Sequence, residues 1–104
     1  MKKDIVYVVM NDGEVKYASI NKEYAKEFAH DQSYNARQEI LEEWGIDNPT
    51  YKDIAEADFQ AGFDGYYYEV VKVNISNKTE GDIVELPDGT EIYVSEILEK
   101  LIWG

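Results

Sequence analysis

Two Asp-Gly dipeptides narrow the possible folds of this chain more than any other feature. Asp12-Gly13 and Asp88-Gly89 each lie between short runs of β-branched and aromatic residues. A two-residue Asp-Gly loop supplies the positive φ angles that a tight hairpin turn requires. The sequence therefore predicts one β-hairpin near each end of the chain, over residues 5–19 and 83–94.

The strands of the sheet are indicated by alternating side chains. Residues 5–10 are apolar on both alternating faces, which is typical of a central strand covered on both sides. In the returning strand, regular alternation places Val15 and Tyr17 on one face. Residues 66–75 form the longest remaining strand candidate, with Val71 and Val73 on one face.

Capping residues indicate where the first two helices begin. Asn21 is expected to cap a helix from residue 22, with Gly45 at its C-terminal end. Polar residues 30–35 interrupt the apolar spacing, so the segment is one long helix or two, and we favour one. Thr50 is expected to cap a second helix over 51–61. Four of its side chains are predicted to face inward: Tyr51, Ile54, Ala55 and Phe59.

The last helix is expected after the second hairpin, capped by Ser95. Its predicted apolar face consists of Ile97, Leu98, Leu101 and Ile102. The resulting order, ββ–α–α–β–ββ–α, predicts a single α+β domain over residues 1–104. Its mostly antiparallel sheet would have about five strands, with the helices packed on it.

The sequence lacks several of the residue sets that enzymes commonly use. It has no cysteine, and His30 is its only histidine, so a thiolate site, a histidine pair or a catalytic triad within one chain is excluded. No glycine-rich phosphate loop is present. We therefore expect no enzymatic activity, no cofactor and no bound metal. A carboxylate-dependent enzyme stays open as a minor alternative, because acids are abundant.

The absence of cysteine fits the cytoplasm, and the first apolar run is too short for a signal peptide. No stretch approaches the ~20 apolar residues of a membrane span. We therefore expect a cytoplasmic protein without a membrane partner.

The net charge is −12, from 22 acidic and 10 basic residues. This excess argues against direct binding of nucleic acid, which depends on Lys and Arg. The acids gather in two blocks. Residues 80–99 hold seven acids and no base, and residues 39–64 hold eight acids and one lysine. Residues 39–64 supply the candidate partner-binding residues: Glu39, Glu42, Glu43, Asp47, Asp53, Glu56, Asp58 and Asp64.

Three of these acids stand where they oppose helix stability. Glu39, Glu42 and Glu43 are spaced i, i+3 and i+4, so like charges repel along one helix face. The last two also lie in the final turn, where the helix dipole disfavours negative charge. Residues that oppose the stability of their own helix, with no local contact to compensate, are typical of functional positions. The alternative, a solvated face that only keeps the protein soluble, stays open.

Spaced carboxylates on a folded scaffold can imitate nucleic-acid phosphates and occupy the basic groove of a nucleic-acid enzyme. Aromatic residues among the acids would serve as anchors in such a contact. They are Trp44, Tyr51, Phe59 and Phe63. The run Tyr66–Tyr68 fits either a core-filling strand or a contact patch. The leading hypothesis is an inhibitor of a basic host enzyme. The alternative is a small structural or regulatory interaction module whose acidity serves solubility.

About half of the chain resembles small proteins of phages and prophages. The similar segments are Val6–Val9, Asp12–Glu14, Ser19–Glu23, Ala25–Ala29 and Tyr67–Val71. In size and acidity the chain is also similar to anti-CRISPR and anti-restriction inhibitors, several of which mimic DNA. The resemblance implies an RNA-guided nuclease or a restriction enzyme as the partner, met in the host cytoplasm. It assigns no role to any individual residue.

Overall fold

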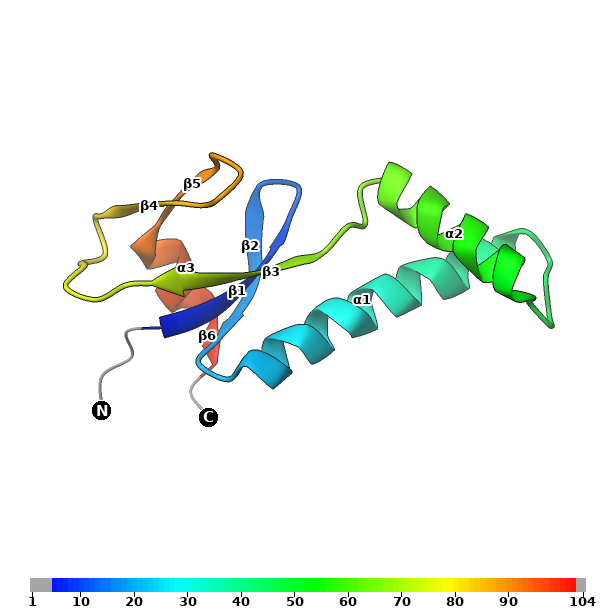
Figure 1. Cartoon of the computed structure of the whole chain (residues 1–104), viewed down its shortest axis with the longest axis horizontal. Coiled ribbons are helices and arrows are strands. Elements are labelled where there is room, and N and C mark those ends of the chain that lie inside the picture. Colours follow the sequence, from blue (N-terminus) through cyan, green and yellow to red (C-terminus); the bar gives the residue numbers. More distant parts are fainter. Residues whose placement is uncertain (1–4, 103–104) are drawn as a thin grey trace.

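The computed structural model describes residues 5–102 and shows an α+β protein (Figure 1). Its six short strands form two sheets, and two of its three helices pair in a projecting hairpin. In chain order the elements are β1 (Ile5–Asn11), β2 (Glu14–Ser19), α1 (Lys22–Glu43), α2 (Tyr51–Phe63), β3 (Glu69–Asn74), β4 (Ile83–Glu85), β5 (Glu91–Tyr93), α3 (Val94–Lys100) and β6 (Leu101–Ile102).

The main sheet has the strand order β3-β1-β2-β6. β1 is central and antiparallel to both neighbours, as its two-sided apolar pattern predicted. The first hairpin is also confirmed. Its turn residues Asp12 and Gly13 have φ angles of 52° and 76°, the positive values that a type I′ turn needs.

The face assignment in β2 was wrong because the strand contains a β-bulge. The register of β1 against β2 shifts by one residue, which leaves Lys16 unmatched in the ladder. Val15 therefore shares a face and a core with Ala18. Tyr17 lies on the other face, where its ring stacks on Phe28 of α1 with the centroids 4.5 Å apart.

The second hairpin is confirmed, but it does not extend the main sheet. β4 and β5 form a separate two-stranded sheet, in place of the single sheet of about five strands that we expected. Together with α3, this hairpin covers one face of the main sheet, and the first half of α1 packs on the other. The larger core comprises Val6, Val8, Met10, Val15, Ala18, Val71, Val73, Leu86, Ile92, Ile97 and Leu101.

The last helix differs from its prediction at both ends. α3 begins at Val94 without a side-chain cap, so Ser95 does not have the expected capping role. The helix stops at Lys100, and the chain continues as β6, parallel to β2. This ending fits the burial of Leu101, which enters the main core and pairs with Ala18 as a strand residue.

α1 is one uninterrupted helix, as favoured from the sequence, and is about 33 Å long at 1.5 Å per residue. The Asn21 side chain caps it by accepting the Glu23 amide at 2.9 Å. Gly45, at φ 73°, ends it. The amides of Gly45 and Ile46 donate to the carbonyls of Glu42 and Leu41, both at 3.0 Å, which completes a Schellman motif.

The second half of α1 extends beyond the sheet and pairs with α2, forming a helical hairpin that projects from the body of the protein (Figure 1). The molecule is therefore elongated, with extents of 50 × 27 × 18 Å. Its radius of gyration is 16.0 Å, against about 13 Å for a compact chain of this length. A small separate cluster holds the two helices together: Ala36, Ile40, Leu41, Ala57 and Ala61.

α2 is rotated about its axis relative to the prediction. Its buried stripe is made by Ala57 and Ala61, four residues apart, whose relative exposures are 0% and 4%. Alanines at this spacing let two helix backbones approach closely, so the larger side chains are left outside. Thr50 caps the helix as expected. Of the four side chains predicted to face inward, Ile54 is half-buried, and Tyr51, Ala55 and Phe59 are exposed.

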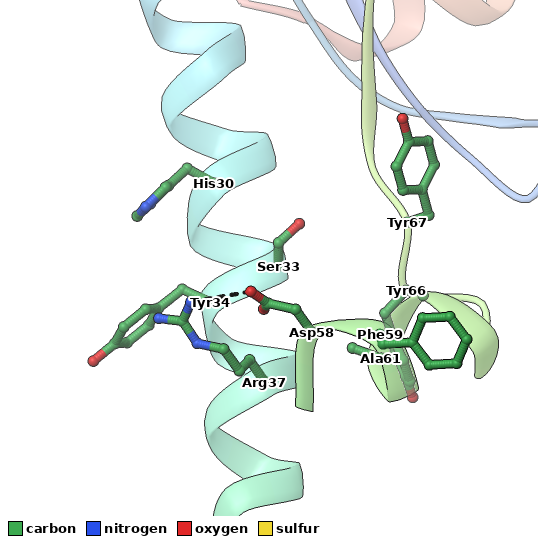
Figure 2. Close-up of a pocket in the computed structure, with 10 residues that line it drawn as sticks. His30, Ser33, Tyr34, Arg37, Asp58, Phe59, Ala61, Tyr66 and Tyr67 are labelled. Atoms are coloured by element: carbon green, nitrogen blue, oxygen red, sulfur yellow. Dashed lines mark hydrogen bonds and ion pairs between the residues drawn. The ribbon is translucent and has the colours of Figure 1, made fainter. Parts of the chain in front are cut away.

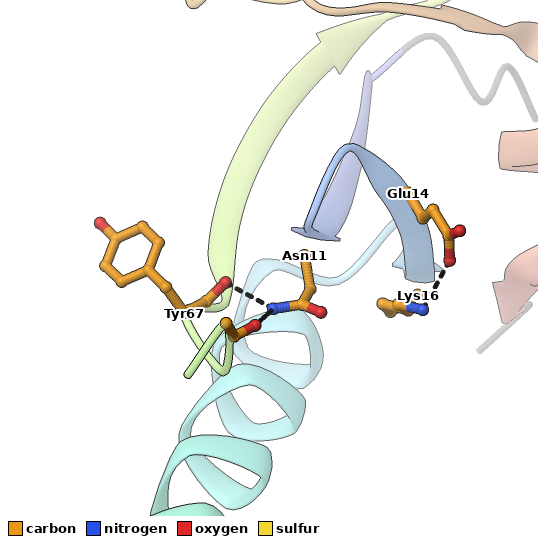
Figure 3. Close-up of polar contacts among 5 residues, drawn as sticks. Asn11, Glu14, Lys16 and Tyr67 are labelled. Atoms are coloured by element: carbon orange, nitrogen blue, oxygen red, sulfur yellow. Dashed lines mark hydrogen bonds and ion pairs between the residues drawn. The ribbon is translucent and has the colours of Figure 1, made fainter. Parts of the chain in front are cut away.

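A short linker after α2 leads back to the sheet. Asn11, at the end of β1, donates its side-chain amide to the carbonyls of Gly65 and Tyr67, at 2.6 and 2.9 Å (Figure 3). The Tyr66 amide still bonds to the Ala61 carbonyl of α2 at 2.9 Å. β3 consequently begins only at Glu69, later than predicted.

Candidate functional site

The acids of residues 39–64 lie along the projecting hairpin, and they fall into two groups. Glu39, Glu42 and Glu43 are exposed at the end of α1, whose last turn contains no basic residue. Asp47 is exposed in the loop between the helices. Among residues 5–102, no hydrogen bond or ion pair involves the side chains of these four acids. Their charges are therefore directed to solvent.

The four acids of α2 and its cap have partners within the chain. Asp53 completes the capping box by accepting the Thr50 amide at 2.9 Å. The other three pairs are Glu56 with Lys52 at 4.0 Å, Asp58 with Arg37 at 3.5 Å, and Asp64 with Gln60 at 3.0 Å. Asp53 thus has a structural role as well as its predicted place in a binding surface. The exposed pairs contribute little to stability.

A groove of about 440 Å³ runs between α1 and α2 (Figure 2). Arg37 lines the groove with 22% of its side chain exposed, and it joins the two helices through its contact with Asp58. Its guanidinium carbon is 5.0 Å from the centroid of the Tyr34 ring. The residues around the groove are His30, Ser33, Tyr34, Arg37, Asp58, Phe59, Ala61, Gly62, Tyr66 and Tyr67.

A second, shallower depression is continuous with the groove and shares four lining residues with it, namely Asp58, Phe59, Gly62 and Tyr67. This aromatic pocket has a volume of about 340 Å³ and is lined by Asp58, Phe59, Gly62, Phe63 and Tyr67. Its three rings are largely in solvent, with relative exposures of 77% for Phe59, 80% for Phe63 and 69% for Tyr67. Rings exposed together to this extent are typical of an interaction surface.

Sequence reasoning identified part of this pocket and missed the rest. The sequence predicts Phe59 and Phe63 as aromatic anchors among the acids, whereas its helix pattern predicts that Phe59 faces inward. Two stripes of i, i+4 spacing compete in α2, one of alanine and one of phenylalanine. The alanine stripe is the buried one, because its small side chains let α2 pack closely against α1. The other proposed anchors, Trp44 and Tyr51, are 44% and 93% exposed.

The acidic end of α1 and the groove occupy different sides of that helix. Arg37 faces the groove, and Glu39 follows two residues later, about 200° further around the helix. Glu56 stands closer to the aromatic pocket, because it precedes Phe59 by three residues and Phe63 by seven on the outer stripe of α2. The hairpin thus presents a charged side and an aromatic side.

The acidic block of residues 80–99 covers the small sheet and α3. Glu85 and Glu91 are directly opposite each other in the β4–β5 pair, an arrangement that destabilises a hairpin through repulsion. On the same outer face, Ile83 pairs with Tyr93, and the two are 46% and 51% exposed. This block lies at the end of the molecule opposite the hairpin (Figure 1).

Three further features of the described part of the chain concern metal ligation, its single histidine and membrane insertion. Among residues 5–102, no three acidic or histidine side chains converge as metal ligands would. The His30 side chain is 77% exposed, 3.8 Å from the adjacent Asp31. No helix within this range is long and apolar enough to cross a membrane. Comparison with protein-family models, curated proteins and solved structures finds no match to the chain.

Proposed function

We propose that this protein is a non-enzymatic binding protein that docks its α1–α2 hairpin onto a basic surface of a partner protein. The observation that carries the proposal is the group of exposed carboxylates at the C-terminal end of α1. Glu39, Glu42 and Glu43 have no compensating base in their turn, and they stand on an arm that projects from the folded body. Such a placement costs helix stability and serves an external contact.

The density of these charges fits a partner that normally handles nucleic acid. Glu39, Glu42 and Glu43 span about 6 Å of helix rise, so neighbouring charges are on average about 3 Å apart along the axis. Along one strand of duplex DNA the phosphate charges are about 3.4 Å apart. A basic groove that accepts phosphates therefore meets a similar charge density on the hairpin. The partner class we propose is a nucleic-acid-handling host enzyme, such as an RNA-guided nuclease or a restriction enzyme, which the protein would inhibit.

A second candidate is favoured by the aromatic pocket. A regulatory interaction module would use the exposed rings for affinity, and its acidity would serve only solubility. The two functions predict different effects of salt on the affinity for the partner. A contact made by carboxylates weakens as ionic strength rises, whereas an apolar contact is retained.

The test is capture of a partner from a bacterial host lysate by the immobilised protein. The hairpin variant E39Q/E42Q/E43Q is compared with E85Q/E91Q/E99Q, which removes the same number of charges from the opposite end. We expect a nucleic-acid enzyme to bind the wild type and the control variant at about 0.05 M salt, and to be lost at about 0.5 M. The hairpin variant should not retain it. Equal retention by both variants would contradict the proposed role of the hairpin, and salt-resistant capture would favour the interaction module.

A further inference from the structure

The aromatic pocket has a defined framework even though its rings are exposed. Phe59 and Phe63 stand on successive turns of α2, opposite the buried alanine stripe that fixes the rotation of the helix. Tyr67 comes from the linker, and its backbone carbonyl accepts a hydrogen bond from Asn11 at 2.9 Å (Figure 3). The three rings are thus attached to backbone that is held on both sides of the pocket.

The chemistry of the lining favours a cation. Aromatic faces carry partial negative charge, and a carboxylate, Asp58, completes the wall with 52% of its side chain exposed. Glu56 also stands near the pocket, three residues before Phe59 on the same stripe of α2. An anionic ligand would meet repulsion from these carboxylates, and a neutral apolar ligand would gain nothing from the part of Asp58 that stays exposed beside its contact with Arg37.

The hairpin already holds one guanidinium in a similar way. Arg37 lies over the Tyr34 ring and contacts Asp58 from the groove side (Figure 2). The aromatic pocket offers the same pair of elements, aromatic rings and Asp58, next to the groove. A planar guanidinium suits such a site better than an ammonium, because it is less strongly hydrated and stacks on aromatic faces.

We propose that the pocket formed by Phe59, Phe63, Tyr67 and Asp58 binds an arginine side chain of the partner protein. This inference rests on the proposed function and identifies the anchor within the basic surface that the hairpin contacts. A second copy of this chain is not the occupant we propose, because each copy carries a charge of −12 and the pocket lies in an acidic region.

The test uses two short Gly-Ser peptides as probes, one with four arginines and one with four lysines, titrated into the protein at about 0.5 M salt to suppress non-specific attraction. Binding is followed by amide chemical shifts of Gly62, Phe63 and Tyr67 in NMR spectra. The variant F59L/F63L keeps apolar bulk and removes the π faces. Y51L removes a ring that is 93% exposed at the other end of α2, away from the pocket, and is the control.

We expect the arginine peptide to bind the wild type and Y51L alike, and F59L/F63L about five- to thirtyfold more weakly. The lysine peptide should bind more weakly than the arginine peptide. Unchanged affinity of F59L/F63L would overturn the proposal, as would equal binding of the two peptides. Sedimentation showing a wild-type dimer that F59L/F63L converts to a monomer would also overturn it, since the occupant would be a second copy.

Failure of this inference is distinguishable from failure of the proposed function. If F59L/F63L retains the partner captured from lysate while E39Q/E42Q/E43Q loses it, the arginine pocket is overturned and the basic docking surface stands. If both variants retain the partner, the hairpin is not the contact and both proposals fall. Loss of the partner by both variants supports both.

Discussion

Replacing Glu39, Glu42 and Glu43 together by glutamine is expected to raise the stability of the protein. The three side chains are exposed at the end of α1 and have no partner among residues 5–102, so the change removes charge without removing a contact. Glutamate and glutamine have nearly equal helix propensities, and the backbone preference is therefore unaffected.

The gain can be worked out from the positions of the charges. Glu39 forms like-charge pairs with Glu42 at i, i+3 and with Glu43 at i, i+4, and relief of each contributes about 0.2–0.5 kcal/mol. Glu42 and Glu43 also oppose the helix dipole, at roughly 0.3 kcal/mol each for exposed groups. The free energy of unfolding should rise by about 1 kcal/mol in total, which corresponds to about 4–8 °C in Tm for a domain of this size.

The assay is urea denaturation followed by far-ultraviolet circular dichroism, repeated at low and high salt. The gain should shrink as salt screens the charges. A useful control is E23Q, the same chemical change in the first turn of α1, where the dipole favours an acid. That variant should lose about 0.3–1 kcal/mol. A loss of stability in the triple variant would refute the reasoning, because it would make these carboxylates structural. A gain that salt leaves unchanged would show that repulsion is not its cause.

Three further predictions concern other parts of the fold. Ala57→Leu should lower the free energy of unfolding in urea by about 1–3 kcal/mol, since Ala57 is fully buried between the helices and the added bulk overpacks them. Glu91→Lys should raise it by about 0.2–1 kcal/mol at low salt, because it replaces a like-charge pair with Glu85 by an opposite one. Hydrogen bonding from Thr90 holds the pKa of Asp88 below its usual value, so its stabilisation is present above the unfolded pKa and is lost as pH falls through the folded one. The Tm of the wild type should therefore fall relative to that of D88N as pH drops below about 4, measured in paired thermal scans.

Local signals identified most of the elements, because those elements depend on nearby residues. The Asp-Gly turns set both hairpins, and Asn21 and Thr50 cap their helices as expected. The helix α1 continues through the polar stretch 30–35, although that stretch interrupts its apolar stripe.

The errors share one cause, namely that the deciding contact came from a distant part of the chain. The bulge at Lys16 depends on the partner strand β1. The rotation of α2 depends on how closely α1 approaches its alanines. The conversion of Leu101 from helix to strand fits the core and the β2 ladder that it joins. None of these partners is visible in a local pattern of residues.

The same division holds for the candidate site. The acidic stretch 39–64 is visible in the residue counts alone. The conflict between Glu43 and the helix dipole follows from its position just before Gly45. The structure adds which acids have partners within the chain, such as Asp53 in its capping box. The aromatic pocket was only partly visible, because Tyr67 reaches it through a linker that Asn11 holds from another element.

The most direct measurement of the central claim is competition between this protein and duplex DNA for the captured, purified partner enzyme. If the hairpin occupies a basic nucleic-acid groove, DNA should displace the wild-type protein. The variant E39Q/E42Q/E43Q should bind the enzyme at least about tenfold more weakly, while E85Q/E91Q/E99Q stays within about twofold of wild type. Simultaneous binding of DNA and protein, with both variants equal to wild type, would contradict the claim.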